Sequence, residues 1–275
     1  MLEIPEAQTI VRQLRATVVG KRITSAVAAS SPHGFAWYFG DPSFYGQLLN
    51  GMEITGAEAY GGRPEIWAGD MRLSFGDGVN IRYFPAEKKR PAKHQLLLEL
   101  DDGDAICCTV QMYGGLWAFP DGVNDDYYYM VAKEKPSPLS AEFSKTYFDS
   151  LFAADTRKLS AKAFLATEQR IPGLGNGVLQ DILWRAKVHP KQKMSALSDD
   201  RIDALYNSVK STLSDMTAQN GRDTEKDLYG ERGGYDTTMS RKNDGMPCPA
   251  CGEIIRRMAY MGGNVYVCEG CQKVE

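Results

Sequence analysis

The chain has 275 residues, of which 43% are apolar and 24% charged; this composition is typical of a globular protein and excludes a disordered chain, a collagen-like fibre and a disulfide-stabilised miniprotein. The length suits two domains better than one. The 32 basic and 35 acidic residues give a net charge of −3, which disfavours a nucleic-acid binder without excluding one, because binding depends on the charge of a single face.

The start of the chain predicts neither a membrane span nor an export signal. No stretch approaches the 18 or more apolar residues that a membrane span requires. The first six residues are acidic and include Pro5, unlike a signal or transit peptide. We therefore expect a cytosolic protein that does not bind a membrane.

A helix is predicted near the N-terminus. Pro5 is tolerated in a first helical turn, and Glu3 and Glu6 lie near the positive end of the helix dipole. Apolar residues follow at helical spacing as far as Val18, and Gly20 can end the helix.

From about residue 21 to residue 131 the pattern changes to short alternating strands. Residues 71–83 alternate on either side of Gly76-Asp77-Gly78, which predicts a hairpin with its turn at these three residues. Residues 95–110 predict a second hairpin. We expect residues 1–133 to form a β-sandwich or barrel with an N-terminal helix.

A second domain is predicted after a linker. Residues 133–138 are charged and contain two prolines, which is typical of a linker. The period then becomes helical, and we assign residues 139–240 to a helical domain. Residues 219–246 are polar and glycine-rich, which predicts a long loop at its end.

The four C-terminal cysteines predict a zinc site. Cys248, Cys251, Cys268 and Cys271 form two Cys-x-x-Cys pairs, each of which can aim two thiolates at one metal ion. Residues 241–275 are therefore expected to form a zinc ribbon with one structural Zn²⁺, since four cysteine ligands leave no open position for catalysis. The adjacent Cys107 and Cys108 point to opposite faces of a predicted strand and cannot easily share a metal.

A glycine-rich turn lies between two predicted helices at residues 171–176. Asn176 can cap the helix that follows, whose first N–H groups favour a phosphate. Lys162 could line the same surface. The alternatives are a turn that binds nothing and a lysine on a solvated helix face.

Together these features resemble one family, the formamidopyrimidine-DNA glycosylases and endonuclease VIII, which excise damaged bases from DNA. The resemblance lies in the opening residues 1–7, a hairpin at 93–109, the Pro-Gly-Leu-Gly-Asn and Arg-Ala-Lys-Val-His-Pro runs within 171–190, and the cysteine segments 245–252 and 268–272. It covers essentially the whole chain in the family's order. The chain is identified on these motifs as a divergent member.

The resemblance implies an α+β protein: an N-terminal helix with a β-sandwich, a helix–two-turn–helix domain and a zinc finger. Such a protein acts as a monomer that encloses double-stranded, damaged DNA and flips the damaged nucleotide into a pocket. In the family a proline after the initiator methionine attacks the sugar C1′. On that mapping Glu3 is the acid/base partner, and Glu6 matches a second family glutamate.

This chain departs from the family at its reactive positions. Leu2 replaces the proline, so Met1 would carry the amine, one residue farther out. An ungapped alignment places Gly69 where the family has a catalytic lysine on an early strand, and Gly263 where it has a finger arginine.

The residues that the resemblance assigns to DNA contact are better kept. Lys162, Gly175 and Asn176 match phosphate-binding positions. Met112 and Tyr113 stand where the family wedges side chains into the duplex, and apolar side chains can fill an unstacked gap.

His94 matches a DNA-contacting histidine of the family or serves a structural role. The leading functional reading is hydrolysis of the N-glycosidic bond of a damaged base, with Glu3 activating water or the Met1 amine and with little or no AP-lyase activity. The alternative is a catalytically silent protein that binds DNA lesions. A zinc-ribbon protein-interaction factor would leave the helix–two-turn–helix match unexplained.

Overall fold

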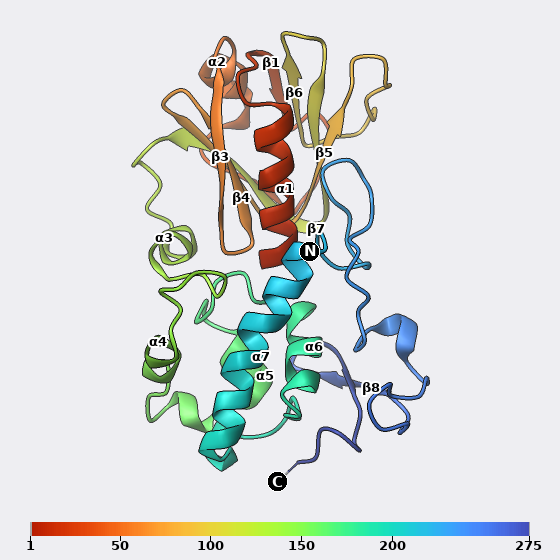
Figure 1. Cartoon of the computed structure of the whole chain (residues 1–275). Helices are drawn as coiled ribbons and strands as arrows, with labels where there is room; N and C mark the ends of the chain where they lie inside the picture. The colour runs from red at the N-terminus through yellow and green to blue at the C-terminus, as the bar shows by residue number, and fades with distance from the viewer. Residues whose placement is uncertain (1, 275) are drawn as a thin grey trace. The chain divides into compact units, whose positions relative to one another are not determined.

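The computed structural model describes residues 2–274 and contains two compact units (Figure 1). The first unit takes in the chain up to Lys133 and, in addition, the segment Gln219–Gly234. The second comprises Glu134–Ala218 and the chain from Tyr235 onward. Residues 219–234 were predicted to belong to the helical domain, but they fold with the first unit because Leu228 is buried in that unit's core and its carbonyl accepts the N–H of Tyr83 at 2.9 Å.

The first unit contains one continuous sheet. Its strands are β1 (Ile23–Ala28), β2 (Ala36–Tyr38), β3 (Ile54–Tyr60), β4 (Arg63–Ala68), β5 (Met71–Phe84), β6 (Leu96–Leu100) and β7 (Ala105–Pro120). The order is β1-β6-β7-β5-β4-β3 with antiparallel neighbours, and the short β2 adds to β7 in parallel. The strands build an antiparallel β-sandwich, which confirms the first of the two predicted architectures.

The predicted turn at residues 76–78 is wrong. β5 runs through this position without reversing, and its register against β7 shifts between Asp77, which pairs with Gly114, and Val79, which pairs with Val110. The three residues 111–113 of β7 are therefore looped out opposite Gly78. A side chain at Gly78 would begin 2.6 Å from the carbonyl oxygen of Tyr113, so only glycine lets this bulge pass.

Helix α1 (Ile4–Thr17) covers β3 and β4, as Figure 1 shows. Its apolar residues Ile10, Val11 and Leu14 are fully buried, and each contributes roughly 1.5–3 kcal/mol through burial. Pro5 lies in the first turn, as predicted. A 3₁₀ turn (Pro42–Phe44), α2 (Tyr45–Leu49) and α3 (Tyr127–Glu134) complete the elements around the sheet.

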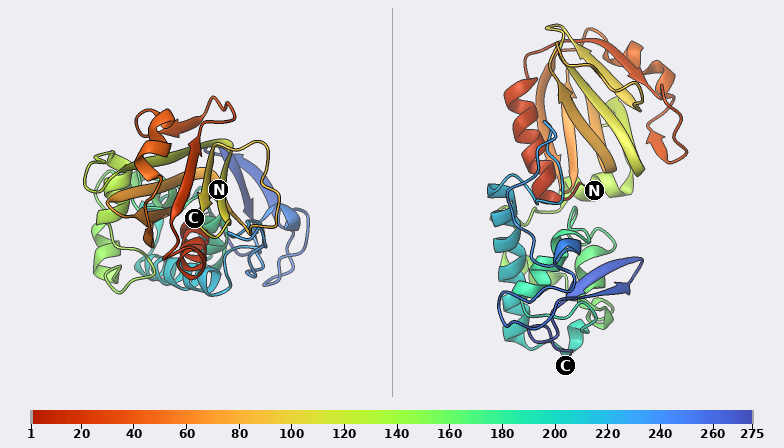
Figure 2. Two further views of the ribbon diagram at one scale, coloured as in Figure 1. Left: turned by 90° about the horizontal axis from the view of Figure 1, so that it is seen from above. Right: turned by 90° about the vertical axis from the view of Figure 1, so that its right-hand side faces the viewer.

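The second unit is mostly helical. Its helices are α4 (Lys145–Ser150), α5 (Ala161–Ala166), α6 (Val178–Arg185) and α7 (Asp199–Ala218), with 3₁₀ turns at Thr156–Lys158, Met194–Ala196 and Arg241–Asn243. Buried Phe143, Phe148 and Phe164 form an aromatic core with Tyr206 of α7. The strands β8 (Arg256–Tyr260) and β9 (Gly263–Val267) form a separate antiparallel pair near the C-terminus, visible in Figure 2. Between residues 2 and 274 no helix is both long and apolar enough to cross a membrane.

Candidate functional site

Two buried carboxylates lie at the start of α1. Glu3 is the N-cap residue, with extended backbone angles, but its side chain makes no capping hydrogen bond. Glu6 lies in the first turn. Both side chains are almost fully buried, at 4% and 3% exposed, and buried carboxylates of this kind require a partner.

The partner is Arg222, from the segment Gln219–Gly234. Its Nη2 and Nε donate to the two oxygens of Glu6 at 2.8 and 3.0 Å, and its backbone N–H donates to Glu6 Oε1 at 3.1 Å. Its Nη1 lies 3.6 Å from Glu3 Oε1. Burial works to lower the pKa of Arg222, but the charges of Glu3, Glu6 and Glu225 outweigh it and raise the pKa above its usual value.

Sequence reasoning missed Arg222. The residue lies in a polar, glycine-rich stretch that predicts only a loop, and its partners are 216 residues or more away in the chain. The flanking Gly221 was the available signal. It has a positive φ of 92°, and a side chain there would begin 3.2 Å from Glu6 Oε1.

Leu2 is held against the sheet beside these carboxylates. Its N–H donates to the carbonyl of Asp77 at 3.1 Å, where β5 changes register, and its side chain packs on the core of the first unit. The predicted nucleophile Met1 lies outside the described residues. Gly69 lies in the turn between β4 and β5 with a φ of 57°, so it is not on a strand, where the resemblance expects the lysine.

In the second unit, the structure brings Lys162 and Asn176 together at the turn between β8 and β9. Lys162 Nζ donates to the carbonyl of Tyr260 at 2.7 Å, and Asn176 Nδ2 donates to the carbonyl of Asn264 at 3.1 Å. A side chain at Gly263 would begin 3.7 Å from Lys162 Nζ and 3.6 Å from Asn176 Nδ2. Burial lowers the pKa of Lys162, whose side chain is enclosed between α5 and this turn.

Gln180 of α6 holds the same turn in place. Its Nε2 donates to the carbonyl of Asn264 at 3.0 Å, and its Oε1 accepts the N–H of Tyr266 at 3.0 Å. The N-cap residue of α6 is Gly177, one position after the predicted Asn176, whose Nδ2 donates to the carbonyl of Asn264. Gly175 lies in the preceding loop, and its carbonyl accepts the N–H of Leu179 at 3.2 Å.

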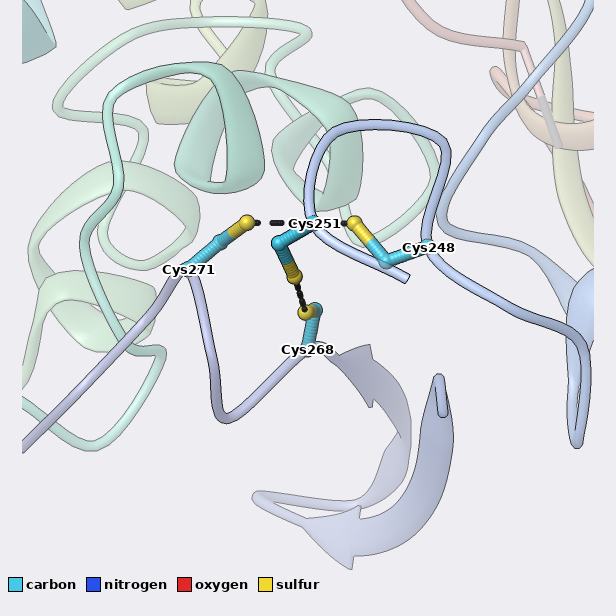
Figure 3. Close-up of side chains that lie close together, drawn as sticks. All are labelled: Cys248, Cys251, Cys268 and Cys271. Atoms are coloured by element: carbon cyan, nitrogen blue, oxygen red, sulfur yellow. Dashed lines mark hydrogen bonds between the residues drawn. The ribbon is translucent and has the colours of Figure 1, made fainter. Parts of the chain in front are cut away.

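The four C-terminal cysteines converge on one point, as Figure 3 shows. Their sulfur atoms all lie within 4.8 Å of one another, with 3.8 Å between Cys248 and Cys271 and 3.3 Å between Cys251 and Cys268. Sulfur ligands about 2.3 Å from a tetrahedral zinc ion would be spaced in this range. The cluster is therefore a possible metal site.

Backbone N–H groups favour the thiolate of Cys248, whereas burial raises the pKa of Cys268 and of Cys271. Burial works to raise the pKa of Cys248, but N–H groups of Ala250 and Cys251 outweigh it and lower the pKa to about 7. Gln272 fixes the second pair, because its Oε1 accepts the N–H of Cys268 at 3.1 Å and its Nε2 donates to the carbonyl of Val188 at 2.9 Å.

The remaining predicted residues lie on the first unit. His94 is half-buried in the loop before β6, where its Nδ1 lies 3.1 Å from the carbonyl oxygen of Pro91. Met112 and Tyr113 belong to the β7 bulge, and Met112 is 68% exposed. Sequence reasoning missed Trp37 of β2, an exposed side chain whose ring centre lies 5.8 Å from that of Tyr113.

Comparison with known proteins shows which proteins this chain resembles. A family model described as the formamidopyrimidine-DNA glycosylase H2TH domain matches residues 135–226. The formamidopyrimidine-DNA glycosylase of Lactobacillus delbrueckii subsp. bulgaricus is 26% identical over 99% of this chain and 100% of its own length. That of Symbiobacterium thermophilum is 28% identical over 100% of this chain and 90% of its own length. The chain is therefore similar to formamidopyrimidine-DNA glycosylases over its whole length, and its residues 135–226 match their H2TH domain.

Solved structures of this family share the fold. The Lactococcus lactis Fpg in complex with DNA containing an abasic site superposes with a TM-score of 0.85 at 23% identity, over 98% of this chain and 99% of that one. The MutM (Fpg) protein of Thermus thermophilus superposes with a TM-score of 0.82 at 22% identity, over 99% of both chains. The resemblance seen in the sequence motifs therefore extends along the whole chain.

Proposed function

We propose that this protein is a base-excision repair enzyme that binds damaged duplex DNA and hydrolyses the N-glycosidic bond of a flipped-out damaged base. Its relatives are named formamidopyrimidine-DNA glycosylases, and the L. lactis relative is described in complex with damaged DNA. The observation that carries the proposal is the buried Glu3 carboxylate at the start of α1, held beside Arg222. We assign the protein to the cytosol and to a monomeric state.

DNA binding is proposed at the junction of Lys162, Asn176 and the β8–β9 turn. These groups offer an ammonium and an amide N–H within a small region of the second unit, which suits a phosphate oxygen. Backbone contacts of this kind position a duplex without reading its sequence. The exposed Met112, together with Tyr113, is proposed to fill the gap left by a flipped nucleotide.

The metal is proposed to be one structural Zn²⁺. Cys248, Cys251, Cys268 and Cys271 would hold it, and the spacing of their sulfur atoms suits a tetrahedral ion. The ion supplies folding energy to the ribbon that presents the β8–β9 turn, because so small a unit has little core of its own. With all four positions taken by cysteines, we assign it no part in the chemistry.

The chemistry is proposed to rest on Glu3. An ionised carboxylate within hydrogen-bond reach of a water molecule can remove its proton as the water attacks C1′. The Met1 amine is the second nucleophile that Glu3 could assist. Leu2 cannot supply the secondary amine of the family's proline, and its own N–H is already committed to Asp77.

We propose little or no AP-lyase activity. Strand cleavage requires a Schiff base at C1′, and the amine of Met1 lies one residue farther out than the family nucleophile. A misplacement of about 1 Å can lower a rate roughly a hundredfold. Gly263, where the resemblance expects an arginine, also leaves the β8–β9 turn without that cation.

The proposal is tested by incubating the protein with a panel of damaged duplexes, with and without hot alkali. Breaks that appear only after alkali indicate base release without lyase activity. Glu3→Gln should abolish base release and leave duplex affinity unchanged, because the substitution keeps the shape of the side chain and removes its basicity. Base release by Glu3→Gln at the wild-type rate would refute the role of Glu3.

The alternative is a silent protein that binds DNA lesions. Leu2, Gly69 and Gly263 favour this alternative, since they stand where the family has its proline, lysine and finger arginine. It predicts tight binding of a lesion duplex with no base release at any pH. The same duplex panel therefore decides between the two functions.

A further inference from the structure

Glu3, Glu6 and Arg222 form a buried charge cluster at the start of α1, and the two carboxylates contact Arg222 differently. Glu6 accepts three hydrogen bonds from Arg222, so both of its oxygens are occupied. Glu3 meets the same guanidinium through one longer contact of 3.6 Å, beyond hydrogen-bond distance. Arg222 therefore anchors itself on Glu6 and acts on Glu3 by charge.

The segment that carries Arg222 is built to keep it in this place. Gly234 donates its N–H to the carbonyl of Gln219 at 2.7 Å, which closes the segment into a loop. A side chain on Gly233 would begin 2.2 Å from the backbone of Gly221 and 2.6 Å from the carbonyl oxygen of Arg222. Two glycines in direct backbone contact thus fix where the guanidinium enters the first unit.

We propose that Arg222 is a positioning residue for base release: it keeps the buried Glu3 carboxylate ionised and fixed, with Glu6 serving as its anchor. The inference rests on the proposed function. In the reaction, Glu3 takes a proton from water, the hydroxyl oxygen bonds to C1′, and the base leaves with the electrons of the N-glycosidic bond. The proton then passes from Glu3 to the departing base, so the carboxylate is regenerated.

The charge of Arg222 decides at which pH this step can occur. Burial favours the protonated form of a carboxyl group, which cannot accept a proton from water, and the charge of Arg222 opposes this effect at Glu3. The charges that act on Arg222 are Glu3 and Glu6 from α1 and Glu225 from its own segment. Removing the guanidinium leaves these three acidic groups without their shared cation and moves the acidic limb of the pH–rate profile upward.

The experiment compares wild type, Arg222→Met and Arg222→Lys by single-turnover base release on one lesion duplex across pH 4.5–9. We expect the acidic limb of Arg222→Met to lie about one to three pH units higher, as for carboxyl groups that gain or lose an arginine neighbour. Arg222→Lys should recover most of this shift, since it keeps the charge but not the paired hydrogen bonds. Duplex affinity should stay within about threefold of wild type, because in this role Arg222 acts on Glu3 and not on the DNA.

Arg12→Met is the matched control. Arg12 also contacts the segment, through Asn220, but its side chain is exposed and this partner is a neutral amide. The acidic limb of the pH–rate profile of Arg12→Met should coincide with that of wild type. If Arg222→Met fails to fold, the double variant Glu6→Gln/Arg222→Met removes one charge of each sign, and the same upward shift is expected from the remaining Glu3.

The outcomes separate the inference from the function on which it rests. An active wild type whose acidic limb is unchanged in the Arg222 variants overturns the inference alone. A shift of equal size in Arg12→Met also overturns it. A wild type that releases no base from any duplex at any pH overturns the proposed function and this inference with it.

Discussion

Lys162→Ala tests where the protein holds DNA. Lys162 commits one of its three N–H groups to the carbonyl of Tyr260 at 2.7 Å, which fixes the ammonium and leaves two N–H groups to meet a phosphate. Asn176 commits one of its two amide N–H groups to Asn264, which leaves one. Lys162 is charged and Asn176 is neutral, so replacing each by alanine should affect duplex affinity and its salt dependence differently.

The expected magnitudes follow from this difference. A hydrogen bond to a charged group contributes about 1.5–3 kcal/mol, so Lys162→Ala should weaken duplex binding roughly 10- to 100-fold. The salt dependence should fall by about 0.9 in slope, because one fewer phosphate is neutralised. Asn176→Ala should cost about 0.5–1.5 kcal/mol and leave the slope unchanged, because the amide is neutral.

Fluorescence anisotropy with damaged and undamaged duplexes between 50 and 200 mM salt measures both quantities. Lys210→Ala is the matched control, since Lys210 also donates to a backbone carbonyl, that of Ser140 at 2.8 Å, but lies on α7 away from the β8–β9 turn. Both duplexes should be affected alike, because phosphate contacts do not read the lesion. Unchanged affinity and slope in Lys162→Ala, in protein that has kept its metal, would show that the DNA face lies elsewhere.

Three further predictions concern the metal, the buried cluster and the amine. Wild type should hold one zinc ion per chain, and Cys251→Ser should lose it and unfold the ribbon; metal analysis and circular dichroism check this, and a folded wild type without zinc would contradict it. Arg222→Met should destabilise the first unit by about 3–5 kcal/mol because two buried carboxylates lose their partner, whereas Arg15→Met, whose pair with Glu58 is exposed, should cost less than about 1 kcal/mol. Hydrogen exchange of α1 peptides measures the loss of stability in both variants. The loss caused by Arg222→Met should shrink as the pH falls, since protonation neutralises the buried carboxylates. Equal losses of stability in Arg222→Met and Arg15→Met would refute the argument. Borohydride trapping on an abasic duplex should be faint in wild type, and Leu2→Pro alone should not restore full strand cleavage; efficient trapping and nicking by wild type would contradict the displaced amine.

Local patterns predicted much of the fold. The spacing of the cysteine pairs is a local property, and it predicted a cluster whose sulfur atoms do converge. The proline and apolar spacing of the first helix are local too, and α1 begins and ends close to the expected positions. The charged segment with two prolines near residue 133 lies where the first unit gives way to the second.

The errors came from tertiary contacts. Gly76-Asp77-Gly78 has the composition of a turn, but β7 loops out residues 111–113 opposite it, which lets β5 continue as one strand. The N-cap residue of α6 is Gly177, one position after the predicted Asn176, and the Asn176 amide also donates to a carbonyl of the β8–β9 turn, 88 residues away. At residues 76–78, pairing with the distant β7 therefore replaced the local choice of a turn.

The two candidate functions make opposite demands on the contact between Arg222 and Glu3. A protein that only binds DNA needs nothing from Glu3, and Arg222 could then pair equally closely with both carboxylates. In this chain the close pairing goes to Glu6, at 2.8 and 3.0 Å, while Glu3 remains 3.6 Å from the guanidinium. A carboxylate kept charged by a cation that does not bind it directly is suited to accept a proton. The geometry of the cluster therefore favours the enzyme over the silent binder.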